Sequence, residues 1–472
     1  MKSSDVAIVW LRKDLRLSDQ PALHAAARAH HRILPLYIWS PEDDGEWAPG
    51  AASRWWLADS LVSLKKSLEL AGSGLIIRKG QALSELLDIV ALSKAKFVYL
   101  NHLYEPAARQ RDDDIFSRLR SMGIALHCFN GSLLADPRHI LNKSGTPYLV
   151  YGAFWRRFQE VELQMPTLAM SELPPLPASP EVYRSLLPSD LALKPEIPWD
   201  AHIKKTWQVG ESEAFKKLGL FRRGCIENYA ASRDIPSSLG TSRLSPHLHF
   251  GEISPRQVWF DAKQGTFEVT TYLKQLVWRE FSYYLLFHYP HIAEHPLRAE
   301  FKDFPWEGTP SHLKAWQQGL TGYPIVDAGM RELWHSGWMH NRVRMIVASF
   351  LVKDLRIHWL EGAKWFWDTL LDADLANNTQ GWQWTSGCGA DASPFFRVFN
   401  PVLQGKKFDP EGLYVKKWLP ELASLPPKLI HTPWEAKKSL DYPDRIVDHD
   451  AARFSVLKAY DDMRRMNQCG VS

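Results

Sequence analysis

Residues 372–384 of this chain read DADLANNTQGWQW, and residues 337–345 read GWMHNRVRM. The two stretches combine acids, amides, arginines and tryptophans, which make a poor apolar core because buried polar groups need hydrogen-bonding partners. This mixture suits a pocket that holds a large, planar molecule through stacking and hydrogen bonds. We therefore expect a fold built around a cofactor site formed by these two stretches.

The length and composition of the chain restrict its class. At 472 residues the chain exceeds a single core, so two or three domains are expected. The content of 45% hydrophobic and 23% charged residues is typical of a globular protein. No apolar run reaches the ~18 residues that a membrane helix needs. The net charge of +4 permits nucleic-acid binding without requiring it. We expect a monomer without a membrane partner.

Cysteine usage indicates a reducing compartment. The cysteines lie far apart and show no metal-ligand or iron–sulfur spacing: Cys128, Cys225, Cys388 and Cys469. The first residues lead into a strand pattern and do not resemble a signal peptide. These features predict a cytoplasmic protein, associated with the nucleoid if the host is bacterial, and no metal site.

Residues 1–132 alternate between two periodicities. Short apolar runs, typical of buried parallel strands, occupy residues 6–11, 33–39, 75–78, 97–100 and 124–129. Helical stretches separate them, one starting near Ser18 and Asp19 with Pro21 in its first turn, and another spanning residues 51–70. Such repeats predict an α/β domain with a doubly wound, parallel five-stranded sheet.

The remainder of the chain changes character twice. Residues 133–198 are rich in proline and predict a long linker with one short helix near residues 153–162. Residues 199–472 lose the strand pattern and predict an all-α domain, with helical periodicity at residues 271–287, 321–335, 341–353, 363–371 and 450–466.

Several ordered motifs resemble one known family along nearly the whole chain. They are WLRKDLRLSD at residues 10–19, GTSRLSP at 240–246, WREF at 278–281, TGYPIVD at 321–327, FNP at 399–401 and the two stretches quoted first. Together they resemble the DNA photolyase/cryptochrome family, most closely the class I photolyases that split cyclobutane pyrimidine dimers. The resemblance implies a light-driven DNA-repair lyase, a flavoprotein that acts on UV-damaged DNA with FAD as its cofactor.

The resemblance also implies an FAD site in the helical domain, with the cofactor in a folded-back shape. The loop at 241–245 would hold the pyrophosphate, and Asn378 would face N5 of the flavin ring. Buried acids need partners, and Arg344 and Arg279 are the natural ones for Asp372 and Asp374. The implied cofactor residues are Tyr229, Thr241, Ser242, Arg243, Leu244, Ser245, Arg279, Trp338, Asn341, Arg344, Asp372, Asp374 and Asn378.

Three tryptophans match the family's electron path from the flavin to the protein surface. They are Trp382, Trp359 and Trp306. Indole is readily oxidised and then releases its N–H proton, so spaced indoles can relay an electron inwards. Trp316 is a candidate for a further station at the surface.

Helical spacing predicts the shape of the substrate site. Gln275 and Trp278 lie one turn apart, as do Asn341 and Met345, so each pair can point into one pocket. The residues that the resemblance implies at the lesion and the DNA are Gln275, Trp278, Asn341, Arg342, Met345, Trp384 and Gln404. Arg397 and Lys407 lie in segments that can meet DNA phosphates.

One residue departs from the class I pattern, which usually has Glu where this chain has Gln275. A glutamine amide donates a hydrogen bond but carries no charge, so we expect repair to persist with lower efficiency. Gln is familiar at this position in (6-4) photolyases, but those enzymes have histidines in place of Asn341 and Met345. A cryptochrome, a blue-light photoreceptor with little repair, is a further alternative. Cryptochromes often have long tails, whereas this chain ends soon after residues 450–466.

Many family members hold a second, light-harvesting chromophore between the two domains. Those that use folate commonly have Asn-Glu a few residues after Tyr-Glu, but here Tyr104-Glu105-Pro106 is followed by Ala107-Ala108. This argues against folate and leaves a deazaflavin, another flavin or an empty cleft as alternatives. The charged residues Arg12, Asp14 and Arg16 are expected to tie the first strand to its neighbours.

Overall fold

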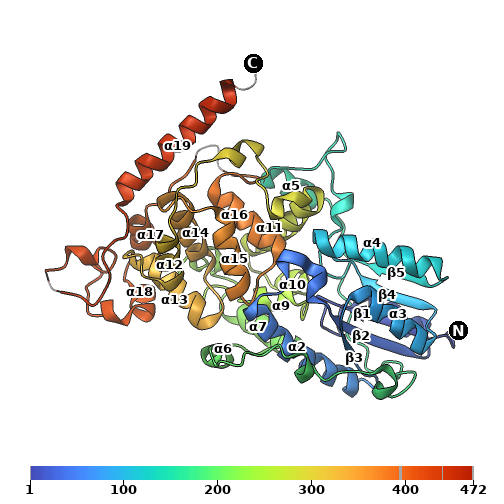
Figure 1. Ribbon diagram of the computed structural model, residues 1–472. Coiled ribbons are helices and arrows are strands. Elements are labelled where there is room, and N and C mark those ends of the chain that lie inside the picture. Colours follow the sequence, from blue (N-terminus) through green and yellow to red (C-terminus); the bar gives the residue numbers. More distant parts are fainter. Residues whose placement is uncertain (1, 393–395, 438, 470–472) are drawn as a thin grey trace.

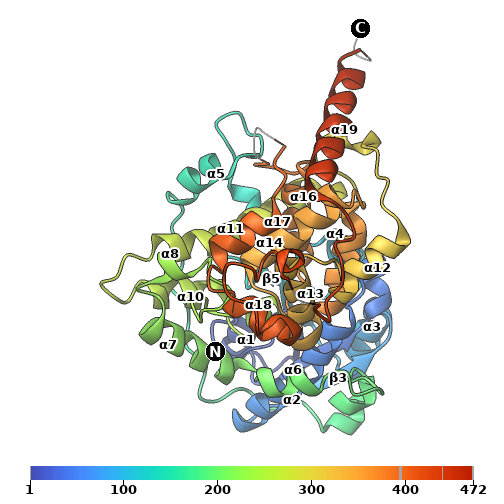
Figure 2. The same cartoon turned by 90° about the vertical axis from the view of Figure 1, so that its left-hand side faces the viewer.

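The computed structural model describes residues 2–392, 396–437 and 439–469. It has a sheet part and a helical part that lie side by side, and the last helix, α19 (His449–Cys469), extends away from both (Figures 1 and 2).

The sheet part is built on five parallel strands, as predicted, and their order is β3-β2-β1-β4-β5. The strands are β1 (Ala7–Leu11), β2 (Ile33–Trp39), β3 (Ile76–Lys79), β4 (Phe97–Asn101) and β5 (Ala125–Phe129). Alternate β1 residues face opposite cores: Val9 packs with α1 (Pro21–Ala29) and α2 (Ala51–Leu70), and Ile8 packs with α3 (Ala82–Ser93) and α4 (Pro106–Ser121). Helices on both faces bury every residue of β1 and β2, which explains their continuous apolar runs, whereas the edge strand β5 is only partly buried.

The start of α1 differs from the prediction. Its N-cap is Gln20, whose side chain accepts from the Leu23 backbone N–H at 3.4 Å, and not Ser18 or Asp19. Asp19 is buried and instead accepts from Ser254 Oγ at 2.5 Å and from Arg256 Nε at 3.0 Å, in the helical part. The sequence pattern could not reveal this because the partners lie more than 230 positions away.

Further buried contacts join the two parts. The Arg16 guanidinium donates to Gly251 O of the helical part at 2.9 Å, and within the sheet part to Gly131 O at 2.7 Å. The Trp56 indole N–H on α2 donates to Glu252 Oε1 at 3.1 Å. We call the contacts that Asp19, Arg16 and Trp56 make with the helical part the interdomain seam. It holds the ends of the strands against the helices.

The helical part contains no β-strand among its described residues, in agreement with the prediction. Its helices are α6 (Ala201–Thr206), α7 (Glu211–Gly224), α8 (Tyr229–Ser232), α9 (Ser245–His249), α10 (Pro255–Ala262), α11 (Thr270–His288), α12 (Pro310–Gln318), α13 (Pro324–Ser336), α14 (Asn341–Ser349), α15 (Trp359–Thr369), α16 (Leu375–Ser386), α17 (Pro401–Phe408), α18 (Leu413–Trp418) and α19.

Two helix boundaries differ from the sequence pattern. The helix predicted for residues 341–353 ends at Ser349 and continues as one π-helical turn, Phe350–Asp354. The helix predicted from residue 363 begins four residues earlier, at Trp359, because the His358 side chain caps it by accepting from the Leu360 N–H.

Residues between the two parts form the expected proline-rich connection, with a single α-helix in its described residues, α5 (Tyr151–Phe158). The connection contacts both parts. Leu186 N–H donates to Ile77 O in the sheet part, and α5 packs on α11 in the helical part. The domain boundaries at residues 132 and 198 stay a prediction.

Candidate functional site

A cavity of about 620 Å³ opens between α11, α14 and α16 in the helical part. It brings together side chains from residues 337–345 and residues 372–384. The residues that were expected at the cofactor or the substrate and that line this cavity are Gln275, Trp278, Arg279, Asn341, Arg342, Arg344, Met345, Asp372, Asn378, Trp382 and Trp384. Exposed Arg397 also lies at its wall.

Both helix-spacing predictions are confirmed. Gln275 and Trp278 reach the cavity from one turn of α11, and Asn341 and Met345 reach it from one turn of α14. Gln275 Nε2 donates to Thr271 O on its own helix at 3.3 Å. The cavity therefore has an aromatic wall and polar groups within the same space.

Asp372, in the turn before α16, and Asp374, at the N-cap of α16, have different partners. Asp372 pairs with Arg344 as expected, because Arg344 Nη2 donates to both carboxylate oxygens, at 3.0 and 2.8 Å. Asp374 caps α16 and accepts from the Asn377 N–H at 2.8 Å. It also accepts a short hydrogen bond from the Tyr283 hydroxyl.

The expected direct pair between Asp374 and Arg279 is absent from the described part of the chain. Arg279 instead contacts Glu280 at 3.3 Å and donates to Ser132 O at 3.0 Å. Burial would raise the pKa of Asp374, but His249, whose Nδ1 lies 3.9 Å from the carboxylate, and the charge of Arg279 together hold that pKa well below its usual range. Asp374 is therefore a stable carboxylate despite being buried.

Asn378 has a fixed orientation at the cavity wall. Its Nδ2 donates to Ala363 O on α15 at 3.0 Å. This bond holds the amide plane in place without a titratable group.

A second cluster of polar residues surrounds Trp338, outside the described lining of the cavity. The Trp338 indole N–H donates to Ser245 Oγ at 3.2 Å, and the Arg243 guanidinium lies 4.4 Å from the Trp338 ring. Trp338 also lies 5.9 Å from the guanidinium of Arg344, which lines the cavity. Thr241, Ser242 and Leu244 are in the same segment as Arg243 and Ser245. Tyr229 is near this segment because its ring packs on Tyr272, with 5.1 Å between the two centroids, and Tyr272 is close to Ser242.

The three expected relay tryptophans differ in burial, since Trp382 and Trp359 are buried and Trp306 is half-buried. Trp382 lines the cavity and packs so closely on α15 that a Cβ at Gly362 would lie 2.1 Å from its ring. Buried Trp359 begins α15, and the His358 ring lies between it and half-buried Trp306, with centroid distances of 5.7 and 5.1 Å.

The expectation that Trp316 is a surface station is wrong. Its side chain has 0% exposure, and its indole N–H donates to Val347 O at 3.0 Å. Its ring centroid lies 6.2 Å from that of Trp382, so it packs in the core behind the cavity.

Only some of the residues that were expected to bind DNA lie together at the cavity. Arg342 lines the cavity, pairs with Asp234 at 3.1 Å and lies 4.3 Å from the Phe408 ring. That contact places α17 beside the cavity. Gln404 and Lys407 are on α17, outside the described lining.

Sequence reasoning missed several residues at this site. Ser282 and Asp391 line the cavity, and Tyr283 and His249 contact Asp374. Ser282 lies one turn after Trp278 on α11, so helical spacing could have found it. No periodic signal leads to Asp391, which lies in a turn after α16.

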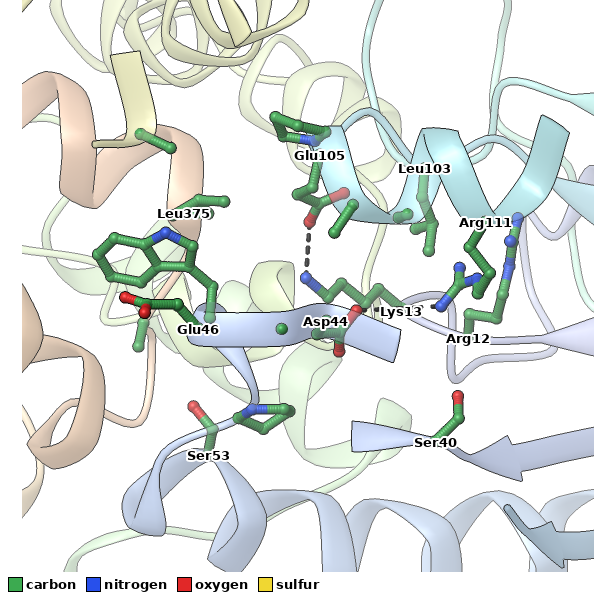
Figure 3. Close-up of a pocket in the computed structure, with 18 of the residues that line it drawn as sticks. Arg12, Lys13, Ser40, Asp44, Glu46, Ser53, Leu103, Glu105, Arg111 and Leu375 are labelled. Carbon is green, nitrogen blue, oxygen red and sulfur yellow. Dashed lines mark hydrogen bonds and ion pairs between the residues drawn. The ribbon is translucent and has the colours of Figure 1, made fainter. Parts of the chain in front are cut away.

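A second cleft, of about 360 Å³, lies between the sheet part and the helical part (Figure 3). It is at the carboxyl ends of the strands, where ligands of doubly wound sheets bind. Lys13 forms an ion pair with Glu105 at 2.6 Å across it. Burial lowers the pKa of Lys13, but Glu105 and Asp44 more than offset this and raise it. Both Ala107 and Ala108 line the cleft.

The charged residues of the opening motif hold β1 in place, as expected. Arg12 forms an ion pair with Asp112 at 2.5 Å, and Asp14 accepts from Asn101 Nδ2 at 2.6 Å. Arg12 also reaches the second cleft.

None of the described helices is both long and apolar enough to cross a membrane. Within the same residues, no group of three or more His, Cys, Asp or Glu side chains has an arrangement that could hold a metal ion.

Comparison with known proteins gives consistent matches. The family model for DNA photolyase matches residues 7–180, and the model for the FAD binding domain of DNA photolyase matches residues 272–462. The chain is 44% identical to a deoxyribodipyrimidine photo-lyase of Agrobacterium fabrum, covering 96% of this chain and 97% of that protein. It is 40% identical to cryptochrome-2 of Arabidopsis thaliana, covering 97% of this chain and 79% of that protein.

A solved structure shares the whole architecture. The crystal structure of a bacterial class III photolyase from Agrobacterium tumefaciens superimposes with a TM-score of 0.94 at 43% identity, covering 98% of this chain and 99% of that one. With its five-stranded parallel sheet and its helical FAD-binding domain, this chain belongs to the DNA photolyase/cryptochrome family.

Proposed function

We propose that this protein is a deoxyribodipyrimidine photolyase that repairs cyclobutane pyrimidine dimers in UV-damaged DNA. One observation carries the proposal: a single cavity of about 620 Å³ has polar groups suited to a flavin and two tryptophan walls suited to a flipped pyrimidine dimer. The cavity is therefore able to hold the cofactor and the lesion next to each other.

The side chains present fit FAD. The Arg344–Asp372 pair and the fixed amide of Asn378 offer hydrogen bonds at the cavity wall. Behind them, Arg243 and Ser245 supply a cation and a hydroxyl for the pyrophosphate. When bound and reduced, FAD supplies the photoexcited electron that opens the cyclobutane ring.

The protein's own part at the lesion is binding and orientation. Enzymes that act on a base in DNA, photolyases among them, extrude the nucleotide from the duplex. Trp278 and Trp384 would stack on the extruded dimer, at ~1–3 kcal/mol per base. Gln275, Asn341 and Met345 would complete that pocket. Arg342, Arg397 and Gln404 would hold the neighbouring phosphates.

The relay assigned to Trp382, Trp359 and Trp306 would restore the cofactor's reduced state from the surface. Its support is the burial of Trp382 and Trp359, which are 2% and 1% exposed, together with half-buried Trp306. Half-buried Trp306 is the station nearest to an external reductant.

A cryptochrome-type photoreceptor with weak or no repair is the second candidate. It is favoured by the 40% identity to a plant cryptochrome and by Gln275 in the cavity. A (6-4) photolyase is disfavoured because Asn341 and Met345, and not histidines, line the cavity. The class I comparison stays a prediction, since the similar solved structure is described as class III.

One experiment separates these functions. The purified, chemically reduced protein is mixed with DNA that contains either a cyclobutane dimer or a (6-4) product and is then illuminated with blue light. Restored thymines in the first DNA alone support the proposal. Restoration in the second alone indicates a (6-4) photolyase, and restoration in neither indicates signalling.

A further inference from the structure

The Trp278 wall of the cavity is held from behind by the connection between the two parts. The Tyr151 ring of α5 stacks on Trp278 with a centroid distance of 3.6 Å and an interplanar angle of 5°. Tyr151 is not among the described residues that line the cavity, whereas Trp278 is. Tyr151 therefore covers the face of Trp278 that is turned away from the substrate space. Its hydroxyl donates to Lys274 O at 2.8 Å, which fixes the Tyr151 ring on α11.

The Trp384 wall is held by the same short segment through one residue. The Trp384 indole N–H donates to Asp391 O at 3.2 Å. The Asp391 N–H in turn donates to Leu149 O at 3.1 Å. Burial raises the pKa of the Asp391 carboxyl, and the nearby Tyr151 backbone partly offsets that rise, so one residue adjoins both walls.

Asp391 adopts a conformation that suits this junction. Its φ of 51° is in the left-handed region, which Asp tolerates better than most residues. Its backbone thereby presents its N–H to Leu149 and its carbonyl to Trp384. We call residues 148–151 and Asp391 the wall support, because their contacts connect the two tryptophans.

We propose that the wall support presets the orientation and spacing of Trp278 and Trp384, and so sets the preference for a flipped dimer over undamaged DNA. Tyr151 and Asp391 are then positioning residues that act through the two tryptophans. This inference rests on the proposed repair function, because it assigns a substrate to the same cavity. If the Trp278 and Trp384 side chains are already ordered, they lose less conformational freedom when DNA binds. The protein's affinity for a dimer that fits between them is therefore higher.

The test uses the full-length flavoprotein and two duplexes of identical sequence, one with a single cyclobutane dimer. Affinity is measured by fluorescence anisotropy, and flipping by 2-aminopurine fluorescence beside the dimer. Tyr151→Leu removes the stack and is expected to weaken binding of the dimer duplex about tenfold, with a reduced 2-aminopurine signal, while undamaged DNA binds as before. Tyr151→Phe keeps the stack and is expected to restore wild-type selectivity.

Two further variants protect the test against misfolding. Trp155→Leu changes another aromatic residue of α5, which lies near Lys274 and not on Trp278, and should leave selectivity unchanged. Asp391→Gly keeps the backbone bonds and tolerates the positive φ, but removes the carboxyl beside the Tyr151 backbone, and should lower selectivity about threefold. This variant decides the question if Tyr151→Leu fails to retain its cofactor.

The outcomes separate the two levels of the proposal. Wild-type selectivity in both Tyr151→Leu and Asp391→Gly overturns the role of the wall support and leaves the repair function standing. Equal affinity of the wild type for both duplexes overturns the repair function, and the inference with it.

Discussion

Arg344 Nη2 donates to both oxygens of the Asp372 carboxylate, at 3.0 and 2.8 Å, and the Asp372 side chain is only 4% exposed. A charge on α14 and a charge in the turn before α16 thus neutralise each other at the wall of the cavity. Arg344 Nε also donates to Met339 O at 2.8 Å, which leaves the guanidinium little freedom. The pair is therefore a built part of the cofactor site and not a mobile surface contact.

Replacing Asp372 with Asn should destabilise the protein and weaken cofactor retention. The change leaves the Arg344 charge without its counter-charge, and breaking a buried pair in this way costs about 3 kcal/mol. Thermal unfolding and the flavin absorbance after gel filtration measure the two effects. Glu213→Gln breaks a comparable pair with exposed Lys216 on α7 and should change neither. Equal losses in the two variants would contradict the assignment.

Replacing Trp306 with Phe should slow photoreduction of the oxidised cofactor while leaving folding intact. Phenylalanine keeps the packing but is much harder to oxidise than indole. The rate is followed by absorbance under blue light with an external reductant. Trp334→Phe is the matched control, because Trp334 is 62% exposed and stacks on Trp365 away from the relay. An unchanged rate in Trp306→Phe would remove this residue from the path.

Replacing Gln275 with Glu should raise the repair yield per photon. The new carboxyl can offer a charge-assisted hydrogen bond to the dimer, where the amide offers a neutral one, a difference of ~1–3 kcal/mol. The yield is measured as thymine restored per absorbed photon. Gln380→Glu makes the same chemical change elsewhere in the cavity and should give no increase. A lower yield in Gln275→Glu would show that the site is adapted to the amide.

Replacing Glu280 with Gln should alter how stability depends on pH. Burial raises the pKa of Glu280 to about 7 from its ordinary 4.5. The folded protein thus holds this proton more tightly than the unfolded chain does. The resulting stability is present below pH 4.5 and is lost as pH rises through 7, by roughly 3 kcal/mol in total.

The measurement for Glu280 is the unfolding temperature across that pH range. Relative to Glu280→Gln, the wild type should lose stability as the pH rises. Glu280 also accepts from the Leu134 N–H at 2.8 Å, so the variant is expected to lose some stability at every pH. Glu227→Gln, on the surface, should follow the wild type. Parallel curves for the wild type and Glu280→Gln would contradict the buried-acid interpretation.

The sheet was predictable because parallel strands covered on both faces are apolar along their whole length, as β2 shows with every residue buried. Helix starts were less predictable where a histidine serves as the cap, as at His358. Within the cavity, one-turn spacing correctly grouped Gln275 with Trp278, because neighbours on a helix face remain neighbours in space.

Other parts of the site depend on contacts that have no local signal. The Tyr283 partner of Asp374 lies 91 positions away, and Trp316 has the same sequence appearance whether it is in the core or at the surface. Tyr151 lies in a proline-rich connection that was expected only to join two domains. Its stack on Trp278 depends on the way in which that connection folds back onto α11.

The interdomain seam has a consequence for chimeric proteins. Asp19 of the sheet part receives hydrogen bonds from Ser254 and Arg256, and Glu252 receives one from Trp56. If the first 130 residues came from another parent, a buried carboxylate or guanidinium would lose its hydrogen-bonding partner. Residues 252–256 would have to be transferred together with them. Recombination between parents should therefore succeed when the crossover carries this short stretch along, and fail when it cuts between the two sides.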